Sequence, residues 1–314
     1  MGLLIQHRGR LGLLRGKLSN LVWVLLMPEL IVRKETGELL FDTSKITYGL
    51  VKSGYMTYLR SDGVYVIRGS NVDPDQKSSY NYNAGKYPIH GFTVSNARSP
   101  VVFIVGRGCL VSTARSGDSV TFYYASASTD TKYYCFDLMA DDIPGSPYLK
   151  TFLNNGVCTF NSLQPPLNIA GVVQAPGPGS VWPNGRYRET YAGGVMTRLS
   201  YYSMTQASGA NIACIVNIDV GGGECAVFLP WSRTATVIDS EAWSFTQPWS
   251  YGVVEGAYGR AGGISFIFAA TTEGIFSQYV GTGAYSPASY VNLPTDRYPQ
   301  ALYIRTAGLP FPYR

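Results

Sequence analysis

Histidine and charged residues are scarce in this sequence. Only two histidines, His7 and His90, occur among 314 residues, and charged residues make up 14% of the chain. His90 lies in the segment YPIHGF between two turn signals, with no serine or cysteine near it in a recognisable nucleophile motif. We therefore expect no histidine-based catalytic triad, and we expect His90 to be a hydrogen-bonded loop residue.

Cysteine is also scarce, and its spacing is irregular. The five cysteines lie mostly inside apolar segments, without a C-x-x-C motif or a Cys/His cluster: Cys109, Cys135, Cys158, Cys214 and Cys225. An odd number without paired spacing disfavours a disulfide framework, and the lack of ligand spacing disfavours a metal site. We expect buried free thiols, no metal and no cofactor, in a protein made in a reducing cytoplasm.

No apolar stretch is long enough to cross a membrane as a helix. The most apolar stretch, Leu21 to Met27, has seven residues and is followed by Pro28 and Glu29, whereas a bilayer-spanning helix needs about 20. Basic residues precede the stretch, as in a secretory signal, but no small-x-small cleavage site follows it. We predict neither a membrane span nor a signal peptide.

Residues 1–26 form a basic and apolar arm. Six leucines in it are spaced 7, 3, 4, 3 and 4 residues apart, as in a heptad seam: Leu4, Leu11, Leu14, Leu18, Leu21 and Leu25. On a helix this seam would pair with another copy or another protein, because a short isolated helix is marginal in water. Three glycines oppose a helix, each costing about 1 kcal/mol relative to alanine. The alternative is that Met27 is the natural start and the arm has little consequence.

The net charge of +5 belongs largely to this arm. Arg8, Arg10, Arg15 and Lys17 contribute +4 to the net charge of +5, so +5 − 4 leaves +1 on the rest of the chain. The remainder contains no basic run of the kind that neutralises phosphates. We therefore predict no nucleic-acid partner.

Glycine, proline and tyrosine are abundant, with 35, 18 and 24 residues. Short β-branched and aromatic runs separated by turn residues indicate an all-β protein. We predict two β-sandwich-like domains, residues 27–172 and 187–314, joined by a Pro/Gly linker at 173–186. Within them, Ser-Asp-Gly at 61–63 and Gly-Gly-Gly at 221–223 are predicted to be hairpin turns.

A G-x-G motif follows the apolar run VVFIV, as in a dinucleotide-binding loop. The fingerprint needs a third glycine three residues after Gly108, where this chain has Val111, and then a helix. The sequence continues instead with the pattern of another strand. We predict that Gly106 to Gly108 form a tight turn.

The densest acidic cluster lies in the segment DLMADDIPG. Asp137 with Asp141 or Asp142 could supply the two carboxylates of a glycan hydrolase. Asp73 and Asp75 form the next cluster, but aspartate beside glycine and proline is also ordinary turn chemistry. The main expectation is that the chain is not an enzyme, with glycan hydrolysis as the alternative.

The second half of the chain has loops rich in tyrosine, tryptophan, serine, glycine and asparagine. Such loops make adaptable binding surfaces, because large rings bury area at low entropic cost. The candidate surface-contact residues are Trp231, Trp243, Trp249, Tyr251, Tyr258, Tyr285 and Tyr290. For any single ring, a place in the core of a sandwich is the alternative.

Three short phrases stand out in the first half of the chain: G-x-x-x-F-D-T-S at Gly37 to Ser44, VFI at Val102 to Ile104, and F-N-S-x-x-x-P-L at Phe160 to Leu167. With these phrases the chain resembles the minor tail proteins of long-tailed bacteriophages (siphophages) of Gram-negative hosts. The resemblance covers about residues 27–171, with a weaker likeness in the closing YIRTAGLPFPY. These phrases carry no catalytic residue, and residues 1–26 have no counterpart in the resemblance.

The resemblance implies a structural virion protein of the distal tail: a tip, baseplate or fibre subunit that takes part in host attachment. It implies synthesis in the host cytoplasm, a homotrimer, and contacts with other tail-tip or baseplate proteins. The first domain would attach to the tail, and the second would face a host-surface glycan or pilus. Two hypotheses compete with this one: a tail-associated glycan hydrolase, and a carbohydrate-binding module with no phage role.

Overall fold

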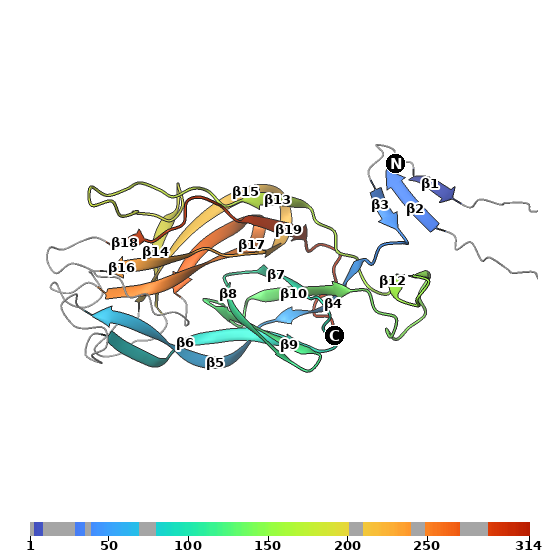
Figure 1. The fold of residues 1–314 in the computed structure, drawn as a ribbon, viewed down its shortest axis with the longest axis horizontal. Helices are drawn as coiled ribbons and strands as arrows, with labels where there is room; N and C mark the ends of the chain where they lie inside the picture. The colour runs from blue at the N-terminus through green and yellow to red at the C-terminus, as the bar shows by residue number, and fades with distance from the viewer. Residues whose placement is uncertain are drawn as a thin grey trace, which may run out of the picture. The chain divides into compact units, whose positions relative to one another are not determined.

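The computed structural model describes residues 3–8, 29–34, 39–68, 80–200, 210–239, 249–270 and 288–314. Every regular element in these ranges is a β-strand, which confirms the all-β prediction (Figure 1). None of the described segments is a helix long and apolar enough to span a membrane. The chain forms two units, the first from residues 1–51 and 136–167 and the second from residues 52–135 and 168–314.

Unit 1 contains two small antiparallel sheets. The first has the order β1 (Leu3–Arg8), β2 (Glu29–Lys34) and β3 (Leu39–Asp42), and the second pairs β11 (Lys150–Phe152) with β12 (Cys158–Asn161). Leu4 lies in β1 opposite Arg33 of β2. The prediction of a helical arm is therefore wrong for residues 3–8, because strand pairing with β2 takes the place of a helix. The other five leucines of the predicted seam, Leu11, Leu14, Leu18, Leu21 and Leu25, lie outside the described residues.

Unit 2 holds most of the large sheet. Its strands are β5 (Thr57–Arg68), β6 (Tyr80–Val94), β7 (Val101–Val105), β8 (Cys109–Ser116), β9 (Ser119–Ala125), β13 (Gly171–Gln174), β14 (Val195–Ser200), β15 (Ala210–Phe228), β16 (Thr234–Asp239), β17 (Trp249–Ala270), β18 (Ser289–Val291) and β19 (Gln300–Arg305). The main path runs β13-β19-β15-β7-β17-β5-β6-β9-β8, with β14 on β15 and with β16 between β17 and β18. Two further strands, β4 (Tyr48–Tyr55) and β10 (Lys132–Leu138), pair with each other and each continue from one unit into the other.

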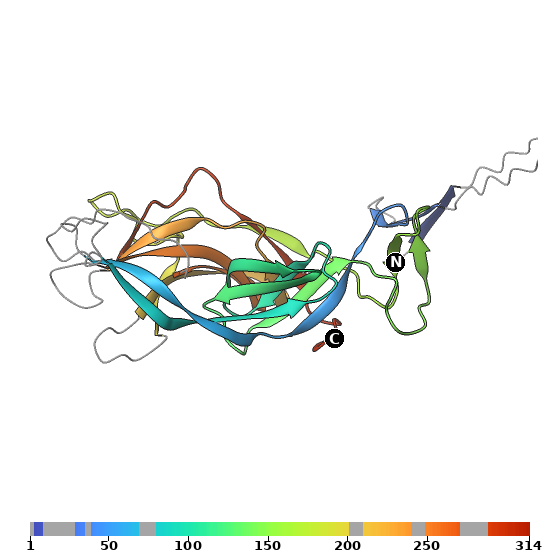
Figure 2. The same ribbon diagram turned by 60° about the horizontal axis from the view of Figure 1, so that its bottom comes forward.

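The path of unit 2 folds into two layers. In Figure 1 the yellow to red strands β13 to β19 form one layer, and β5, β6, β8 and β9 form the other. The 60° turn of Figure 2 brings the blue and green strands of the second layer to the front. The layers join where β17 pairs with β5 at Trp249 opposite Arg68. Side chains such as Phe266, Phe268 and Ile212 fill the core and are almost fully buried.

The two units divide the chain differently from the predicted domains at 27–172 and 187–314. Unit 2 combines strands from both halves of the sequence, and β13 pairs with β19 from Gly171 opposite Tyr303. The predicted linker at 173–186 begins inside β13, and within it the Trp182 amide donates to the Arg186 carbonyl at 2.8 Å. Proline and glycine do not distinguish a linker from a loop that packs on its own domain.

Two of the predicted hairpin turns are irregularities inside long strands. Residues 61–63 lie within β5, where the register against β6 shifts between Asp62 and Val64. Residues 221–223 lie within β15, where Gly221 and Gly222 have positive φ angles of 68° and 70°. Before these glycines β15 pairs with β17, and after Glu224 it pairs with β19. Glycine permits the bulge here as readily as it permits a turn.

The G-x-G motif is a turn, as predicted. It connects β7 to β8, and Gly106 has a φ of 86°. The Thr131 hydroxyl donates to the Arg107 carbonyl at 2.9 Å and holds this turn in place. Gly108 of this turn lines the cavity that is described next.

Candidate functional site

The predicted surface aromatics do not form one surface. Trp231 is 44% exposed, whereas Tyr251, Tyr258 and Tyr290 are 5%, 9% and 0% exposed. These three are core residues, which corrects the surface prediction for them. Trp243 and Tyr285, and the side chain of Trp249, lie outside the described residues.

The position of each buried tyrosine explains the correction. Tyr251 and Tyr258 lie in β17, which is covered on both faces, and the Ile212 amide donates to the Tyr251 hydroxyl at 2.9 Å. Tyr290 lies in β18 opposite Val237 of β16. Aromatic residues suit a central strand as well as an exposed loop, so composition alone did not separate the two.

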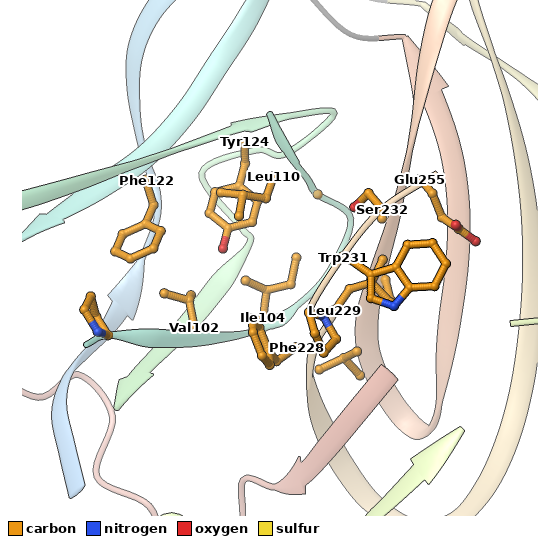
Figure 3. A pocket seen from close by; sticks show the side chains of 16 residues that line it. Val102, Ile104, Leu110, Phe122, Tyr124, Phe228, Leu229, Trp231, Ser232 and Glu255 are labelled. Carbon is orange, nitrogen blue, oxygen red and sulfur yellow. The ribbon is translucent and has the colours of Figure 1, made fainter. Parts of the chain in front are cut away.

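A cavity of about 280 Å³ lies beside Trp231 in unit 2 (Figure 3). Four separate segments build it. Strand β7 provides Val102 and Ile104, which share one face because strand side chains alternate, while Phe103 between them is fully buried. The hairpin β8–β9 provides Leu110, Phe122 and Tyr124. The segment 228–232 at the end of β15 provides the wall that includes Trp231, and residues 255–257 of β17 complete the lining.

A buried ion pair fixes that wall. Arg233 Nε donates to Glu255 Oε2 and Arg233 Nη2 donates to Glu255 Oε1, both at 2.8 Å. The two side chains are 1% and 0% exposed. The Tyr191 hydroxyl also donates to Glu255 Oε1 at 2.8 Å, and burial and then the neighbouring Glu255 carboxylate raise the pKa of Tyr191. Bidentate geometry with further hydrogen bonds is what a buried ion pair requires.

Backbone bonds connect the ion pair to the same wall. The Glu255 amide donates to the Arg233 carbonyl at 2.9 Å, and the Arg233 amide lies 3.3 Å from Glu255 Oε2. Arg233 Nη1 reaches the Pro294 carbonyl at 3.2 Å. The segment that ends in Arg233 is therefore bonded to β17 and to the loop before β19. These contacts hold the wall of the cavity in one position.

The predicted acidic pair is split between the interior and the surface of unit 1. Asp137 is 3% exposed in β10 and accepts a hydrogen bond from the Leu138 amide at 2.7 Å. Asp141 is exposed and forms an ion pair with Lys150 at 2.6 Å, and Asp142 is also exposed. Hydrolysis by these carboxylates stays a prediction. Asp73 and Asp75 lie outside the described residues.

The cysteines are buried and free, as predicted. Burial raises the pKa of the Cys109 thiol to about 12, so this thiol stays protonated near neutral pH and is a poor nucleophile. Burial also raises the pKa of Cys214 and of Cys225. Over the described residues, no three His, Cys, Asp or Glu side chains gather as metal ligands would.

His90 is a strand residue, which corrects the loop prediction. It lies in β6 between Tyr58 of β5 and Tyr124 of β9, and it is 8% exposed. Its ring meets the Tyr58 ring edge-on with centroids 6.1 Å apart. Its Nδ1 atom has no hydrogen-bond partner among the residues described. Burial lowers the pKa of His90 below its ordinary value of 6.5, because a charged imidazolium is disfavoured there.

Acidification is therefore expected to destabilise the protein through His90. The unfolded state binds a proton near pH 6.5, whereas the folded state does so at lower pH, so the stabilising contribution is complete above 6.5. It is lost as the pH falls from 6.5 through the folded-state pKa. Urea unfolding midpoints between pH 7.5 and 5.5 measure this loss. His90→Phe should reduce the change of the urea midpoint with pH, and His7→Gln should leave that change as in the wild type. An unchanged pH dependence of the midpoint in His90→Phe would contradict the role given to His90.

No family model, curated protein or solved structure matched this chain. The cavity, the ion pair and the exposed Trp231 are therefore interpreted from their geometry in this chain alone. Of these features, only Trp231 is predicted from the sequence. Nothing in the local pattern around Arg233 or Glu255 marks them as partners, since they lie 22 residues apart and meet only through the pairing of β16 with β17.

Proposed function

We propose that this chain is a structural virion protein of the distal bacteriophage tail, a tip, baseplate or fibre subunit that takes part in host-surface attachment. The observation that carries the proposal is the set of three phrases that resemble minor tail proteins. An all-β chain with two units is compatible with such a role, but a fold does not by itself define a function. Each of these phrases makes structural contacts in this chain.

The phrase F-N-S-x-x-x-P-L binds along β4 in unit 1. The Leu50 amide donates to the Pro165 carbonyl at 2.8 Å, and the Leu167 amide donates to the Tyr48 carbonyl at 2.9 Å. Gln164 is fully buried, and its Oε1 accepts a hydrogen bond from the Ala140 amide at 2.7 Å. Asn161 Nδ2 donates to the Ala140 carbonyl at 2.9 Å. The phrase therefore satisfies buried backbone groups, which is a structural requirement.

The other two phrases have structural roles as well. In F-D-T-S, the Asp42 carboxylate accepts hydrogen bonds from the Ser44 amide at 2.8 Å and the Ser44 hydroxyl at 2.6 Å, which closes the turn after β3. The phrase VFI forms β7 in unit 2, with Phe103 fully buried. Residues with these roles support a shared architecture with tail proteins.

Unit 1 also exposes apolar side chains suited to a protein contact. Tyr148 is 100% exposed, Leu149 is 42% exposed and Phe152 is 41% exposed, and all three lie in or just before β11. Neighbouring exposed apolar residues of this kind favour an interface. These residues also belong to the predicted domain at 27–172, and they support its assignment to attachment on another tail protein.

Electron microscopy of virions tests the proposed location. Antibodies against this chain, coupled to gold, should label the distal end of the tail. The same antibodies on virions that lack the gene product provide the control. Label on the capsid, or on no virion, would overturn the proposal.

Light scattering tests the proposed homotrimer. The full-length chain should have three times the mass of one chain. A form that starts at Met27 lacks β1, so it should show whether the β1–β2–β3 sheet takes part in assembly. Monomers for both forms would contradict self-assembly of the isolated protein.

A further inference from the structure

A buried hydroxyl group points into the cavity beside Trp231. Tyr124 is 4% exposed, and its hydroxyl points toward Val102 and Ile104 (Figure 3). Among the described residues, no hydrogen bond to this hydroxyl is found. Burial raises the pKa of Tyr124, so the hydroxyl is neutral and can either donate or accept. Because the hydroxyl opens into the cavity, a bound polar group there can donate a hydrogen bond to it or accept one from it.

Most of the cavity lining is apolar, and the cavity has the size of a small ring system. Val102, Ile104, Leu110 and Phe122 face it. A cavity of about 150 Å³ holds one benzene molecule, so by proportion about 280 Å³ holds a group of about ten non-hydrogen atoms. A phenol or an indole ring is of this size, whereas a longer ligand would extend into solvent.

The polar groups around the cavity limit the ligand further. Both carboxylate oxygens of Glu255 already accept hydrogen bonds from Arg233 and Tyr191. Besides Tyr124, the lining offers the Ser232 hydroxyl and the Trp231 indole at the exposed wall. A sugar ring would bring several hydroxyls against apolar walls and leave most of them without partners. The lining therefore suits a ring with one polar substituent.

The exposed wall is rigid and partly aromatic. Trp231 can pack against a ring that enters the cavity, because aromatic pairs favour stacked or edge-to-face contact. The buried ion pair between Arg233 and Glu255 fixes the end of the segment 228–232 that carries Trp231. A cavity that is already formed avoids the entropy cost of ordering its walls when a ligand binds.

We propose that this cavity binds a compact aromatic ring with one hydrogen-bonding substituent, of the phenol or indole type. The ring packs against Phe122, Leu110 and Trp231, and its substituent forms a hydrogen bond with the Tyr124 hydroxyl. The ring has two sources, a free aromatic molecule or a tyrosine side chain carried by a polypeptide. This site does not depend on the tail function proposed above.

Ligand-observed NMR titrations with p-cresol and toluene test the site on the full chain. The two probes differ by one hydroxyl. We expect p-cresol to bind about 2- to 13-fold more tightly than toluene, the range of one ordinary hydrogen bond. Tyr124→Phe should remove this difference and leave toluene binding unchanged. Tyr123→Phe is the matched control, since Tyr123 projects from the opposite face of β9, under Arg60, and it should behave as the wild type.

Two further measurements show whether the probe binds in this cavity and whether the natural ligand is a free aromatic molecule or a polypeptide side chain. Leu110→Trp fills the cavity from its partly exposed edge and should abolish binding of both probes. N-acetyltyrosinamide carries the same ring on a peptide, so tighter binding than p-cresol indicates a polypeptide source and weaker binding indicates a free aromatic. Undetectable p-cresol and N-acetyltyrosinamide binding, equal affinity for p-cresol and toluene, or unchanged binding in Leu110→Trp would overturn the proposal.

Discussion

Replacing Glu255 by glutamine is expected to lower the free energy of unfolding by about 3–5 kcal/mol, the cost of breaking a buried ion pair. The side chains of Arg233 and Glu255 are 1% and 0% exposed, so the Arg233 guanidinium would stay buried without a counter-charge. The glutamine amide would also place its own donor against an Arg233 or Tyr191 donor. Urea unfolding should show a lower midpoint with an unchanged slope.

An exposed ion pair on the same strand provides the control. Arg260 contacts Asp219, but the Asp219 side chain is 85% exposed. Asp219→Asn should therefore change the free energy of unfolding by less than about 1 kcal/mol. The double variant Arg233→Met with Glu255→Leu should recover much of the loss, because removing both charges leaves neither one unpaired. Equal effects of Glu255→Gln and Asp219→Asn would contradict the structural role of the buried pair.

Replacing Gly259 by alanine is expected to cost about 3 kcal/mol or more, above the usual range for overpacking. A Cβ atom at this position would lie 1.7 Å from the Cys225 carbonyl oxygen and 2.8 Å from Ala226 Cα. Both contacts are with the backbone of β15, so no side-chain rotation relieves them. The strands would have to separate at the point where Gly259 also accepts a hydrogen bond from the Gly106 amide at 2.9 Å. Soluble yield and the urea midpoint measure the effect.

Gly223→Ala is the matched control for this substitution. No atom lies within 4 Å of a Cβ built on Gly223, and its φ is outside the left-handed region. We expect a change within about 0.5 kcal/mol, as for ordinary surface substitutions. A Gly259→Ala protein as stable as the Gly223→Ala protein would show that β15 and β17 can move apart at this point.

The class of fold was predictable because it depends on local patterns. Alternating β-branched and aromatic runs with frequent turn residues indicate strands whatever their partners are. The partners themselves were not predictable in the same way. Gly221 to Gly223 resemble a hairpin turn, yet β15 continues through them, because bulge and turn require the same backbone freedom. The domain boundaries differed for a related reason, since β13 pairs with a strand more than a hundred residues later.

The candidate site depends on tertiary contacts and was mostly not predictable. Trp231 was identified from composition, and its exposure fits that prediction. Tyr124 lies in an apolar strand and gave no signal, because its significance depends on a cavity formed with β7 and the segment 228–232. The same is true of Arg233 and Glu255, which look like two ordinary surface charges until strand pairing buries them. Periodicity indicates which side chains share a face, and it does not indicate what covers that face.

The last described residues of the chain have a consequence for its synthesis. Strand β19 lies between β13 and β15, and Tyr313 exchanges backbone hydrogen bonds with Ser53, at 2.9 Å in both directions. While the ribosome is still translating this region, the neighbours of β19 lack their shared partner, and their free edges can pair with other chains. Unit 2 can therefore close only after Tyr313 has emerged from the ribosomal tunnel. Until then, the unpaired edges of β13 and β15 leave a nascent chain open to misassembly with its neighbours on the polysome.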